Sequence, residues 1–408
     1  MTAREYPVFT VTPKAERSLR AGHPWVYGEE VTAVEGAYQN GDMVDVVSNK
    51  GRYLGTGWVN DHSKIRVRII SRNANDTFDE AFFRRRVCYA LNYRKTVMGP
   101  VDYRCCRLIF GEADQFPGLT VDRFENILVT QVLSLGMERR KDWVYRALVE
   151  LLREDGEQID AIYERNDVAI RTLEGLEQGK GFYQMEGLRT DLSGHVTITE
   201  NGIKYDVDYI EGQKTGFFLD QKYNRQAAAK LARGRRVLDC FTHTGAFALN
   251  AAAAGAEHVT AVDVSAFALE LAAENGKRNG LTNLDYKCAD VFDLLTEMAK
   301  EKKCDYDYII LDPPAFTKSR ATAKNAYHGY KEINRKAMRL LPRGGYLATC
   351  SCSHFMTDEM FRKMLQEAAL DAGVTLRQIE ARQQAPDHPI LPGVPETDYL
   401  KFYLLQVV

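Results

Sequence analysis

The sequence predicts a multi-domain protein with an N-terminal β-barrel, a central small α+β domain and a C-terminal α/β domain of Rossmann-like topology. Three observations support this prediction. Short β-prone runs separated by Gly, Asn and Asp fill residues 1–76. Strands and a helix mix over residues 77–194, and residues 195–408 go over to strands that alternate with helices. Such alternation is typical of a parallel sheet with helices on both faces.

The composition indicates an ordinary cytoplasmic protein. The 408 residues are 45% hydrophobic and 27% charged, and the formal net charge is −2, so the overall charge does not indicate a nucleic-acid-binding protein. No stretch approaches the roughly 18 apolar residues that a membrane helix needs, and no secretory segment opens the chain. Eight cysteines are few for a disulfide scaffold and lack zinc-ligand spacing. We therefore expect reduced thiols, no metal and no membrane.

In the first two domains, the prediction includes one basic strand face and one basic helix. Apolar and basic side chains alternate in KIRVRII (64–70), and the basic face fits either solvent or RNA. A helix is expected over 78–97, and its residues Arg84–Arg86 are candidates for contact with RNA phosphates. The central domain is expected in the order strand, strand, helix, strand, strand. A hairpin that turns at Asn201–Gly202 follows it.

The C-terminal domain should carry its ligand-binding residues where its strands end, because ligands of parallel sheets bind outside the carboxyl ends of the strands. Asp239 ends the first strand, and Gly245 closes the loop behind it. Asp263 ends the next strand, where a carboxylate can accept hydrogen bonds from ribose hydroxyls. Asp290 ends the third, beside Phe292. Neither a dinucleotide fingerprint nor a P-loop lysine is present, so this pattern predicts a site for S-adenosylmethionine.

The fourth strand ends in the motif LDPPAF, which contains Asp312, Pro313, Pro314 and Phe316. Two prolines fix the loop and remove two N–H donors, so the motif predicts a rigid shelf beside an acid that can hold a flat base. A purely structural alternative is a proline-rich turn after a buried strand. It explains the two prolines but not the presence of Asp312 together with the aromatic ring of Phe316. Lys318 follows as a positive neighbour.

The fifth strand ends in TCSC, which places Cys350 or Cys352 on the same edge as Asp312. Carbon 5 of a pyrimidine is a poor nucleophile until a thiolate adds to carbon 6, and a methyltransferase that acts on nitrogen or oxygen needs no thiol. A thiol beside an acid in this position therefore predicts methylation of carbon 5. Two small buried cysteines remain the simpler structural alternative.

Together, these motifs resemble the bacterial 5-methylcytosine methyltransferases of large-subunit ribosomal RNA that carry an N-terminal PUA domain. The resemblance covers nearly the whole chain. It rests on GHPWVYGEE, FGEADQFPGLTVDRF, YERND, EGQKTGFFLDQKYNR, VLDCFTHTGAF, DPPAF, GYKEIN, TCSCS, APDHP and YLKFY. It implies a PUA-like RNA-binding domain over 1–76, a central β-β-α-β-β domain over 77–194 and a class I methyltransferase domain over 195–408.

The resemblance also implies roles for individual residues. Cys352 is implied as the nucleophile because it lies eight residues past Gly344, and Cys350 is expected to be structural. Asp312 is implied as its catalytic partner. The implied cofactor-binding residues are Asp239, Phe241, Gly245, Asp263, Asp290, Phe292, Phe218, Asp220 and Arg225. The implied substrate-binding residues are Pro313, Pro314, Phe316 and Lys318.

In one position the chain departs from related RNA cytosine-5 enzymes. Ala315 follows Pro314, where those relatives carry a cysteine thought to help release the product, so another base or water would be needed. The expected partner is large-subunit ribosomal RNA, and a homodimer is left open. Two alternatives stay open as well: methylation of an exocyclic amino group by the Asp-Pro-Pro loop, and a ribosome assembly factor that binds RNA and cofactor without catalysis.

Overall fold

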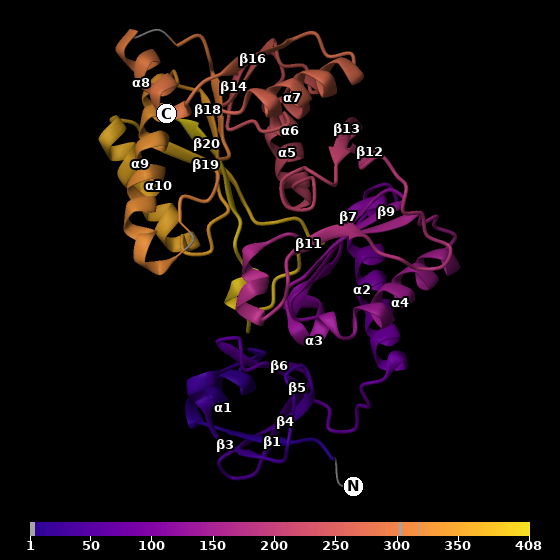
Figure 1. Cartoon of the computed structure of the whole chain (residues 1–408). Coiled ribbons are helices and arrows are strands. Elements are labelled where there is room, and N and C mark those ends of the chain that lie inside the picture. Colours follow the sequence, from indigo (N-terminus) through magenta and orange to yellow (C-terminus); the bar gives the residue numbers. More distant parts are fainter. Residues whose placement is uncertain (1–4, 302–303, 318) are drawn as a thin grey trace. The chain divides into compact units, whose positions relative to one another are not determined.

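The computed structural model describes residues 5–301, 304–317 and 319–408, and these residues form two compact units (Figure 1). The first unit comprises the chain up to Ile198, Val207–Leu219 and Pro386–Thr397; the second comprises Thr199–Asp206, Asp220–Ala385 and Asp398–Val408. In the described part of the chain, no helix combines the length and the apolar character needed to cross a membrane.

The N-terminal part of the first unit is a six-stranded sheet in the order β2-β6-β5-β4-β1-β3. Its interior is filled by apolar side chains such as Phe9, Val44 and Val67. A helix that the sequence analysis missed begins behind the Thr12 cap, whose hydroxyl accepts the Ala15 N–H at 3.3 Å. The elements are β1 (Val8–Val11), α1 (Pro13–Arg20), β2 (Trp25–Tyr27), β3 (Val31–Glu35), β4 (Met43–Ser48), β5 (Tyr53–Val59) and β6 (Ile65–Ser71).

The basic face of β6 is not an open surface. Arg68 is buried and forms ion pairs with Glu112 at 3.4 Å and with Glu174 at 2.7 Å, and Arg66 pairs with Asp61 at 2.9 Å. Glu112 and Glu174 belong to the central part of the same unit. The alternation of charge along this strand therefore reflects internal packing, at least at Arg68.

The central part of the first unit has five strands in the order β11-β10-β9-β8-β7, one more than predicted. The additional strand arises because the segment 119–134 is a hairpin that turns at Glu125, whose φ of 55° is left-handed. The elements are α2 (Glu80–Val97), β7 (Cys105–Phe110), β8 (Leu119–Phe124), β9 (Ile127–Val132), α3 (Leu135–Glu138), α4 (Lys141–Glu154), β10 (Ala161–Asn166) and β11 (Gly179–Phe182).

The three consecutive arginines of α2 make contacts inside the first unit. Arg84 pairs with Glu150 and Glu154 of α4, and Arg85 pairs with Asp76. Arg86 is buried, donates to the Gln115 carbonyl at 3.1 Å and lies over the Phe82 ring. Arg86 is therefore used inside the protein, whereas contact of the partly exposed Arg84 and Arg85 with RNA phosphates stays a prediction.

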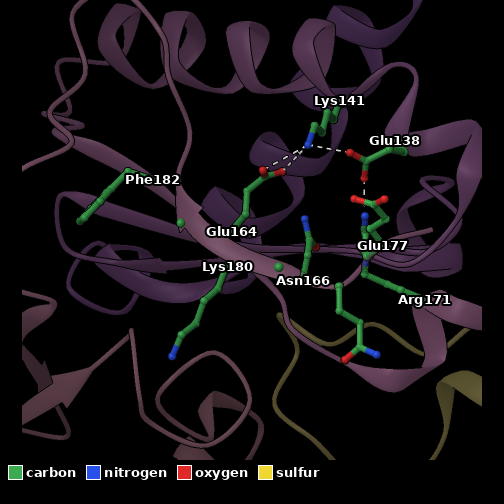
Figure 2. A pocket seen from close by; sticks show the side chains of 11 residues that line it. Glu138, Lys141, Glu164, Asn166, Arg171, Glu177, Lys180 and Phe182 are labelled. Carbon is green, nitrogen blue, oxygen red and sulfur yellow. Dashed lines mark hydrogen bonds and ion pairs between the residues drawn. The ribbon is translucent and has the colours of Figure 1, made fainter.

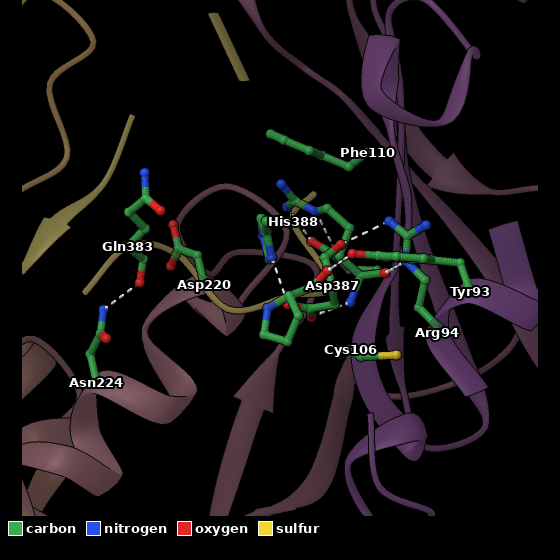
Figure 3. A network of polar contacts seen from close by, with 12 residues as sticks. Tyr93, Arg94, Cys106, Phe110, Asp220, Asn224, Gln383, Asp387 and His388 are labelled. Carbon is green, nitrogen blue, oxygen red and sulfur yellow. Dashed lines mark hydrogen bonds and ion pairs between the residues drawn. The ribbon is translucent and has the colours of Figure 1, made fainter. Parts of the chain in front are cut away.

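A buried polar network anchors a C-terminal segment to the central sheet (Figure 3). Arg94 of α2 is fully buried, pairs with both oxygens of Asp114 at 2.5 and 2.7 Å, and donates to the Asp387 carbonyl at 2.8 Å. The Asp387 carboxylate accepts the backbone N–H of Arg107, and His388 packs against Phe110. Residues 386–397 therefore belong to the first unit, although they are far from it in sequence.

The second unit is built on a seven-stranded sheet in the order β16-β15-β14-β17-β18-β20-β19. The first five strands in this order are parallel, as predicted. Two strands were missed: β20, which runs antiparallel to β18, and β19, which runs antiparallel to β20. The strands are β14 (Arg236–Cys240), β15 (His258–Asp263), β16 (Leu284–Cys288), β17 (Tyr308–Leu311), β18 (Tyr346–Ser351), β19 (Leu376–Arg382) and β20 (Lys401–Val407). A hairpin of β12 (His195–Glu200) and β13 (Ile203–Asp208) precedes them.

Helices cover both faces of this sheet, as the alternation of strands and helices predicted (Figure 1). One apolar cluster joins the sheet to α8, α9 and α10, and a second joins it to α5 and α6. The helices are α5 (Lys222–Ala229), α6 (Ala246–Ala253), α7 (Ala266–Arg278), α8 (Val291–Glu301), α9 (Ala323–Leu340) and α10 (Asp358–Ala372). Both faces are thus sealed, and the carboxyl ends of the strands remain for ligands.

Replacing Asp114 by Ala should destabilise the protein by about 3–5 kcal/mol, because it leaves the Arg94 guanidinium charged, buried and short of its carboxylate. Equilibrium unfolding in urea measures this change. Asp191→Ala is the matched control, since Asp191 is exposed and should change the stability by less than about 0.5 kcal/mol. Equal unfolding free energies of the two variants would show that the buried Arg94–Asp114 ion pair does not determine the stability of the first unit.

Candidate functional site

The predicted site residues gather where neighbouring parallel strands end in register. Asp239 of β14 lies opposite Ala261 of β15, and Leu311 of β17 pairs with both Cys240 and Thr349. The residues that follow these strands therefore emerge at one edge of the sheet. This edge, which we call the strand-end rim, comprises the segments 239–245, 263–267, 290–292, 312–317 and 350–353.

The loop after β14 has an unusual backbone. Phe241 and His243 adopt left-handed conformations with φ of 65° and 51°, and Gly245 follows with φ of 84°. Left-handed φ is costly for residues with a side chain, and such strain is concentrated at binding sites. At Gly245 an added Cβ would lie 2.4 Å from Leu249, so only glycine fits. The loop is thus held in a shape that brings its backbone close to the rim.

Asp239 lies at the base of this loop and is fully buried. Its Oδ2 accepts the Thr242 hydroxyl at 2.5 Å, and its Oδ1 is buried without a hydrogen-bond partner among the described residues. Burial, reinforced by the carboxyl of Asp312, raises the pKa of Asp239 from 3.8 to about 7. This side chain is therefore available to donate a proton in a hydrogen bond near neutral pH.

Asp263 ends β15 and is oriented by two backbone groups. Its Oδ2 accepts the N–H of His243 at 2.9 Å, and its Oδ1 accepts the N–H of Ser265 at 2.9 Å. Each carboxylate oxygen can accept a further hydrogen bond, so the acid can still bind ribose hydroxyls. The same contacts make Asp263 an anchor for the strained loop.

Asp290 and Phe292 both make structural contacts within the second unit. Asp290 is exposed, and its Oδ1 accepts the N–H of Asp293 at 3.1 Å, so it caps the first turn of α8. Phe292 packs beside Phe316, with ring centroids 5.8 Å apart. A role for either residue toward an adenine ring remains a prediction.

Asp312 emerges at the end of β17 among other polar groups of the second unit. Its Oδ1 accepts a hydrogen bond from Gln221 Nε2 at 3.0 Å, and Cys350 also bonds to its carboxyl group. Desolvation, and then the nearby carboxylate of Asp220, raise the pKa of Asp312 from 3.8 to about 6. Asp312 is therefore poised between its neutral and charged forms just below neutral pH.

Three residues of the motif KTGFFLDQKYNR lie in different surroundings. Asp220 is buried and accepts the Tyr399 hydroxyl at 2.6 Å. Arg225 is buried in an ion pair with Glu200 of β12, so its charge is used to hold the hairpin to α5. Phe218 belongs to the first unit, where Lys214 lies 4.7 Å above its ring. Direct contact of these three with a cofactor stays a prediction.

The Asp-Pro-Pro loop is partly enclosed. Pro313 is buried and Pro314 is exposed, while Phe316 packs 4.5 Å from the ring of Tyr330. The carbonyl of Thr317 accepts the Ser353 hydroxyl at 3.2 Å, which ties this loop to the segment behind β18. Lys318 lies outside the described residues.

The two cysteines after β18 differ in accessibility. Cys350 is fully buried, and burial next to the Asp312 carboxyl raises the pKa of its thiol well above the usual range. Cys352 is only partly buried. Because nucleophilic attack requires a thiolate that the substrate can reach, Cys352 is the better candidate of the two.

Sequence reasoning missed two contributors to the rim. Gln221 bonds to Asp312 and also accepts a hydrogen bond from Asn224 at 2.7 Å, so the motif DQKYN supplies an orienting amide. Lys401, at the start of the missed strand β20, donates to the carbonyl of Ser353 at 2.7 Å. The sequence signal for Lys401 was the motif YLKFY, which was noted but not placed on a strand.

A hollow of about 280 Å³ in the first unit is a weaker candidate (Figure 2). Lys141 on its wall pairs with Glu138 and Glu164, and Arg171 pairs with Glu138. These two cations are neutralised by carboxylates of the wall itself, so they are not free to bind an anionic ligand. Among the residues that the structure describes, no group of three or more metal-ligand side chains occurs.

The strand-end rim fits S-adenosylmethionine on three structural grounds. Asp263 presents a carboxylate with spare acceptor capacity, the strained loop exposes backbone, and the buried Oδ1 of Asp239 lacks a partner. Val264 and Phe267, directly after Asp263, are 72% and 65% exposed, which leaves apolar surface for a purine ring.

Comparison with protein families agrees with this geometry. Residues 9–72 match a PUA-like domain, and residues 183–405 match the S-adenosylmethionine-dependent methyltransferases. The fold class predicted from the sequence is therefore confirmed, and so is its cofactor, S-adenosylmethionine.

Curated relatives match the chain from end to end. "Ribosomal RNA large subunit methyltransferase I" from Shewanella denitrificans is 42% identical over 97% of this chain and 98% of its own. The protein of the same name from Pseudoalteromonas atlantica is 40% identical over 98% of this chain and 99% of its own. A structure described as a SAM-dependent methyltransferase from Streptococcus mutans superposes with a TM-score of 0.81 at 22% identity, covering 98% of this chain and 100% of its own.

Asp263→Ala should weaken S-adenosylmethionine binding by about 1–3 kcal/mol, because it removes ribose acceptors and leaves two backbone N–H groups of the loop without their partner. Isothermal titration calorimetry measures the affinity. Asp285→Ala is the control, since Asp285 is an exposed acid near the amino end of β16, whereas the strand-end rim lies at the carboxyl ends of the strands. An unchanged affinity in Asp263→Ala would remove this residue from the cofactor site.

The raised pKa of Asp239 predicts a pH-dependent stability difference. Since the folded protein binds this proton more tightly than the unfolded chain, the stabilisation is complete below the ordinary pKa of 3.8 and is lost as the pH rises toward 7. Relative to Asp239→Asn, the wild type should therefore lose about 2–4 kcal/mol of unfolding free energy between pH 4 and pH 8. Urea unfolding without cofactor at both pH values measures it; a pH-independent difference would contradict the raised pKa.

Proposed function

We propose that this chain, which belongs to the S-adenosylmethionine-dependent ribosomal RNA large subunit methyltransferase I family, transfers a methyl group to carbon 5 of a cytosine in large-subunit ribosomal RNA. Matches of 40–42% identity over nearly the full length of named relatives support the reaction and the RNA substrate. The observation that supports carbon 5 is the partly accessible thiol of Cys352 on the same rim as Asp312.

In this proposal, S-adenosylmethionine supplies an electrophilic methyl group when it is bound at the rim. Asp263 would hold the ribose hydroxyls, and the strained loop from Phe241 to Gly245 would lie against the rest of the cofactor. Asp239 would act from beneath the loop as a neutral carboxyl group, because its pKa is raised to about 7.

Cys352 would act as the nucleophile. Its thiolate sulfur would bond to carbon 6 of the cytosine, and the electron pair of the ring double bond would become available at carbon 5. Carbon 5 would then take the methyl group, whose bond to the cofactor sulfur breaks and leaves its electron pair on that sulfur. Loss of the carbon-5 proton to a base then restores the double bond and expels the thiolate. Atoms and charge balance without an oxidant or a metal ion.

Asp312 would orient and protonate the base. With a pKa of about 6, it can hold a proton for the ring nitrogen of the cytosine or accept a hydrogen bond from the exocyclic amine. Gln221 and Cys350 fix the carboxyl group from behind. Cys350 is fully buried, and its expected contribution is to packing.

The PUA-like domain, which we assign to residues 1–76, would supply RNA affinity in this proposal. Exposed cations in this region, such as Lys50 and Arg52, are better candidates for phosphate contact than Arg84 of α2, which is paired with two carboxylates. In this proposal the enzyme acts in the cytoplasm, where its ribosomal RNA substrate would be found.

Cys352→Ala should reduce methyl transfer by at least about a thousandfold and leave cofactor affinity unchanged, because the thiol contacts the base and not the adenosine. Cys350→Ala is the matched control and should retain most activity, with a loss of stability. Transfer of radiolabelled methyl groups to ribosomal RNA, followed by mapping of 5-methylcytosine, measures both effects.

RNA that carries 5-fluorocytosine at the target should form a stable covalent adduct with the wild type, because fluorine cannot leave as a proton. The adduct should be absent from Cys352→Ala and present in Cys350→Ala. The reverse pattern would make Cys350 the nucleophile. If neither substitution changes turnover, the carbon-5 mechanism fails and methylation of an exocyclic amino group replaces it.

A further inference from the structure

A buried lysine lies next to the proposed nucleophile, on the strand that the sequence analysis missed. Lys401 begins β20, which runs antiparallel to β18, and it pairs in register with Ser351, the residue before Cys352. Its side chain is 4% exposed. Its Nζ donates to the carbonyl of Ser353 at 2.7 Å and to the carbonyl of Tyr399 at 2.8 Å.

The charge of Lys401 is not neutralised by an ion pair. No carboxylate of a described residue lies within 4 Å of Nζ. Asp358 accepts the hydroxyl of Tyr403, and Asp398 accepts the amide of Gln383 at 3.1 Å. An ammonium group has three donors, and two are used by backbone carbonyls. A buried lysine in this condition is costly to the fold unless a negative group comes to it.

The group placed to receive this charge is the thiol of Cys352. Lys401 bonds to the carbonyl of the very next residue, and Cys352 is one of the groups whose charge acts on Lys401. Burial lowers the pKa of Lys401 to about 8, while Asp398, Cys352 and Asp358 oppose that shift. The attraction is mutual, so the ammonium favours the thiolate as much as the thiolate favours the ammonium.

We propose that the buried ammonium of Lys401 is the positive group that keeps Cys352 in its thiolate form. This inference rests on the proposed role of Cys352 and makes Lys401 a positioning residue that acts through it. Other titratable groups around this pair are Asp312 at the end of β17, Tyr330 on α9, Cys350 on β18, His354, Asp358 on α10 and Asp398. Because Asp312, Asp358 and Asp398 are acids, they disfavour a thiolate, and Lys401 has to outweigh them.

The test is the pH profile of alkylation of the purified full-length protein by iodoacetamide, without RNA or cofactor. Mass spectrometry reports the rate at the peptide of Cys352 and, as an internal reference, at the exposed Cys288. K401Q removes the charge and keeps a donor, whereas K401R keeps the charge. K363Q, at an exposed lysine of α10, is the control.

In K401Q the midpoint of the Cys352 profile should rise by about one pH unit or more, which slows its alkylation at pH 7 roughly tenfold. K401R should restore most of the rate, and Cys288 should be unaffected in every variant. An unchanged Cys352 profile in a K401Q protein that still binds S-adenosylmethionine would overturn the proposal. The proposal would also be overturned if Cys352 were alkylated as slowly in K401R as in K401Q. In that case the hydrogen bond from Lys401 to the Ser353 carbonyl would matter, and the positive charge would not.

Two further comparisons keep this proposal separable from the proposed function. If K401Q does not fold, K401M, which keeps an unbranched apolar stem, is subjected to the same alkylation measurement with the same criteria. If the wild type forms no 5-fluorocytosine adduct but its Cys352 alkylation profile depends on Lys401, Cys352 is not the nucleophile. The electrostatic pairing of Lys401 with Cys352 is then still upheld. If the adduct forms but the alkylation profile of Cys352 is the same in K401Q as in the wild type, the role of Cys352 is upheld and the role of Lys401 is overturned.

Discussion

The parallel register of β14, β15, β17 and β18 is the constraint on which the rest of this site depends. Strands that run in one direction and pair residue by residue must end at one edge. That edge therefore collects Asp239, Asp263, Asp312 and Cys352, which are separated by up to 113 positions (352 − 239) in the sequence. Helices seal both faces of the sheet, so its edge is where backbone and polar side chains can meet a ligand.

Collecting acids at one edge has an electrostatic consequence. Each carboxylate that is removed from water beside another disfavours the charge of its neighbour, and the pKa values of Asp239 and Asp312 rise accordingly. Neutral carboxyl groups can donate hydrogen bonds as well as accept them. A thiolate at the same edge would be disfavoured by these acids and would require a positive charge nearby. Lys401 is a buried cation whose Nζ donates to the carbonyl of Ser353, the residue after Cys352.

Charge is used differently in the first unit. Its buried arginines Arg68 and Arg94 pair with carboxylates and thereby join the N-terminal sheet, the central sheet and the segment after Pro386. Removing one partner from such a pair is expensive, because the remaining ion stays buried. The buried arginines Arg68 and Arg94 thus contribute to the cohesion of the first unit.

The sequence by itself determined the alternating strands and helices, their bounds to within a few residues and the acids at the strand ends, because these follow from local periodicity and turn chemistry. It also indicated the cofactor, S-adenosylmethionine, through the acids at the strand ends. Tertiary structure alone decided which cysteine is reachable, that the arginines of α2 are paired, and that Lys401 lies beside Cys352. Those facts depend on burial and on antiparallel pairing between Ser351 and Lys401, fifty positions apart (401 − 351). Contacts of that separation leave no periodic trace in the chain.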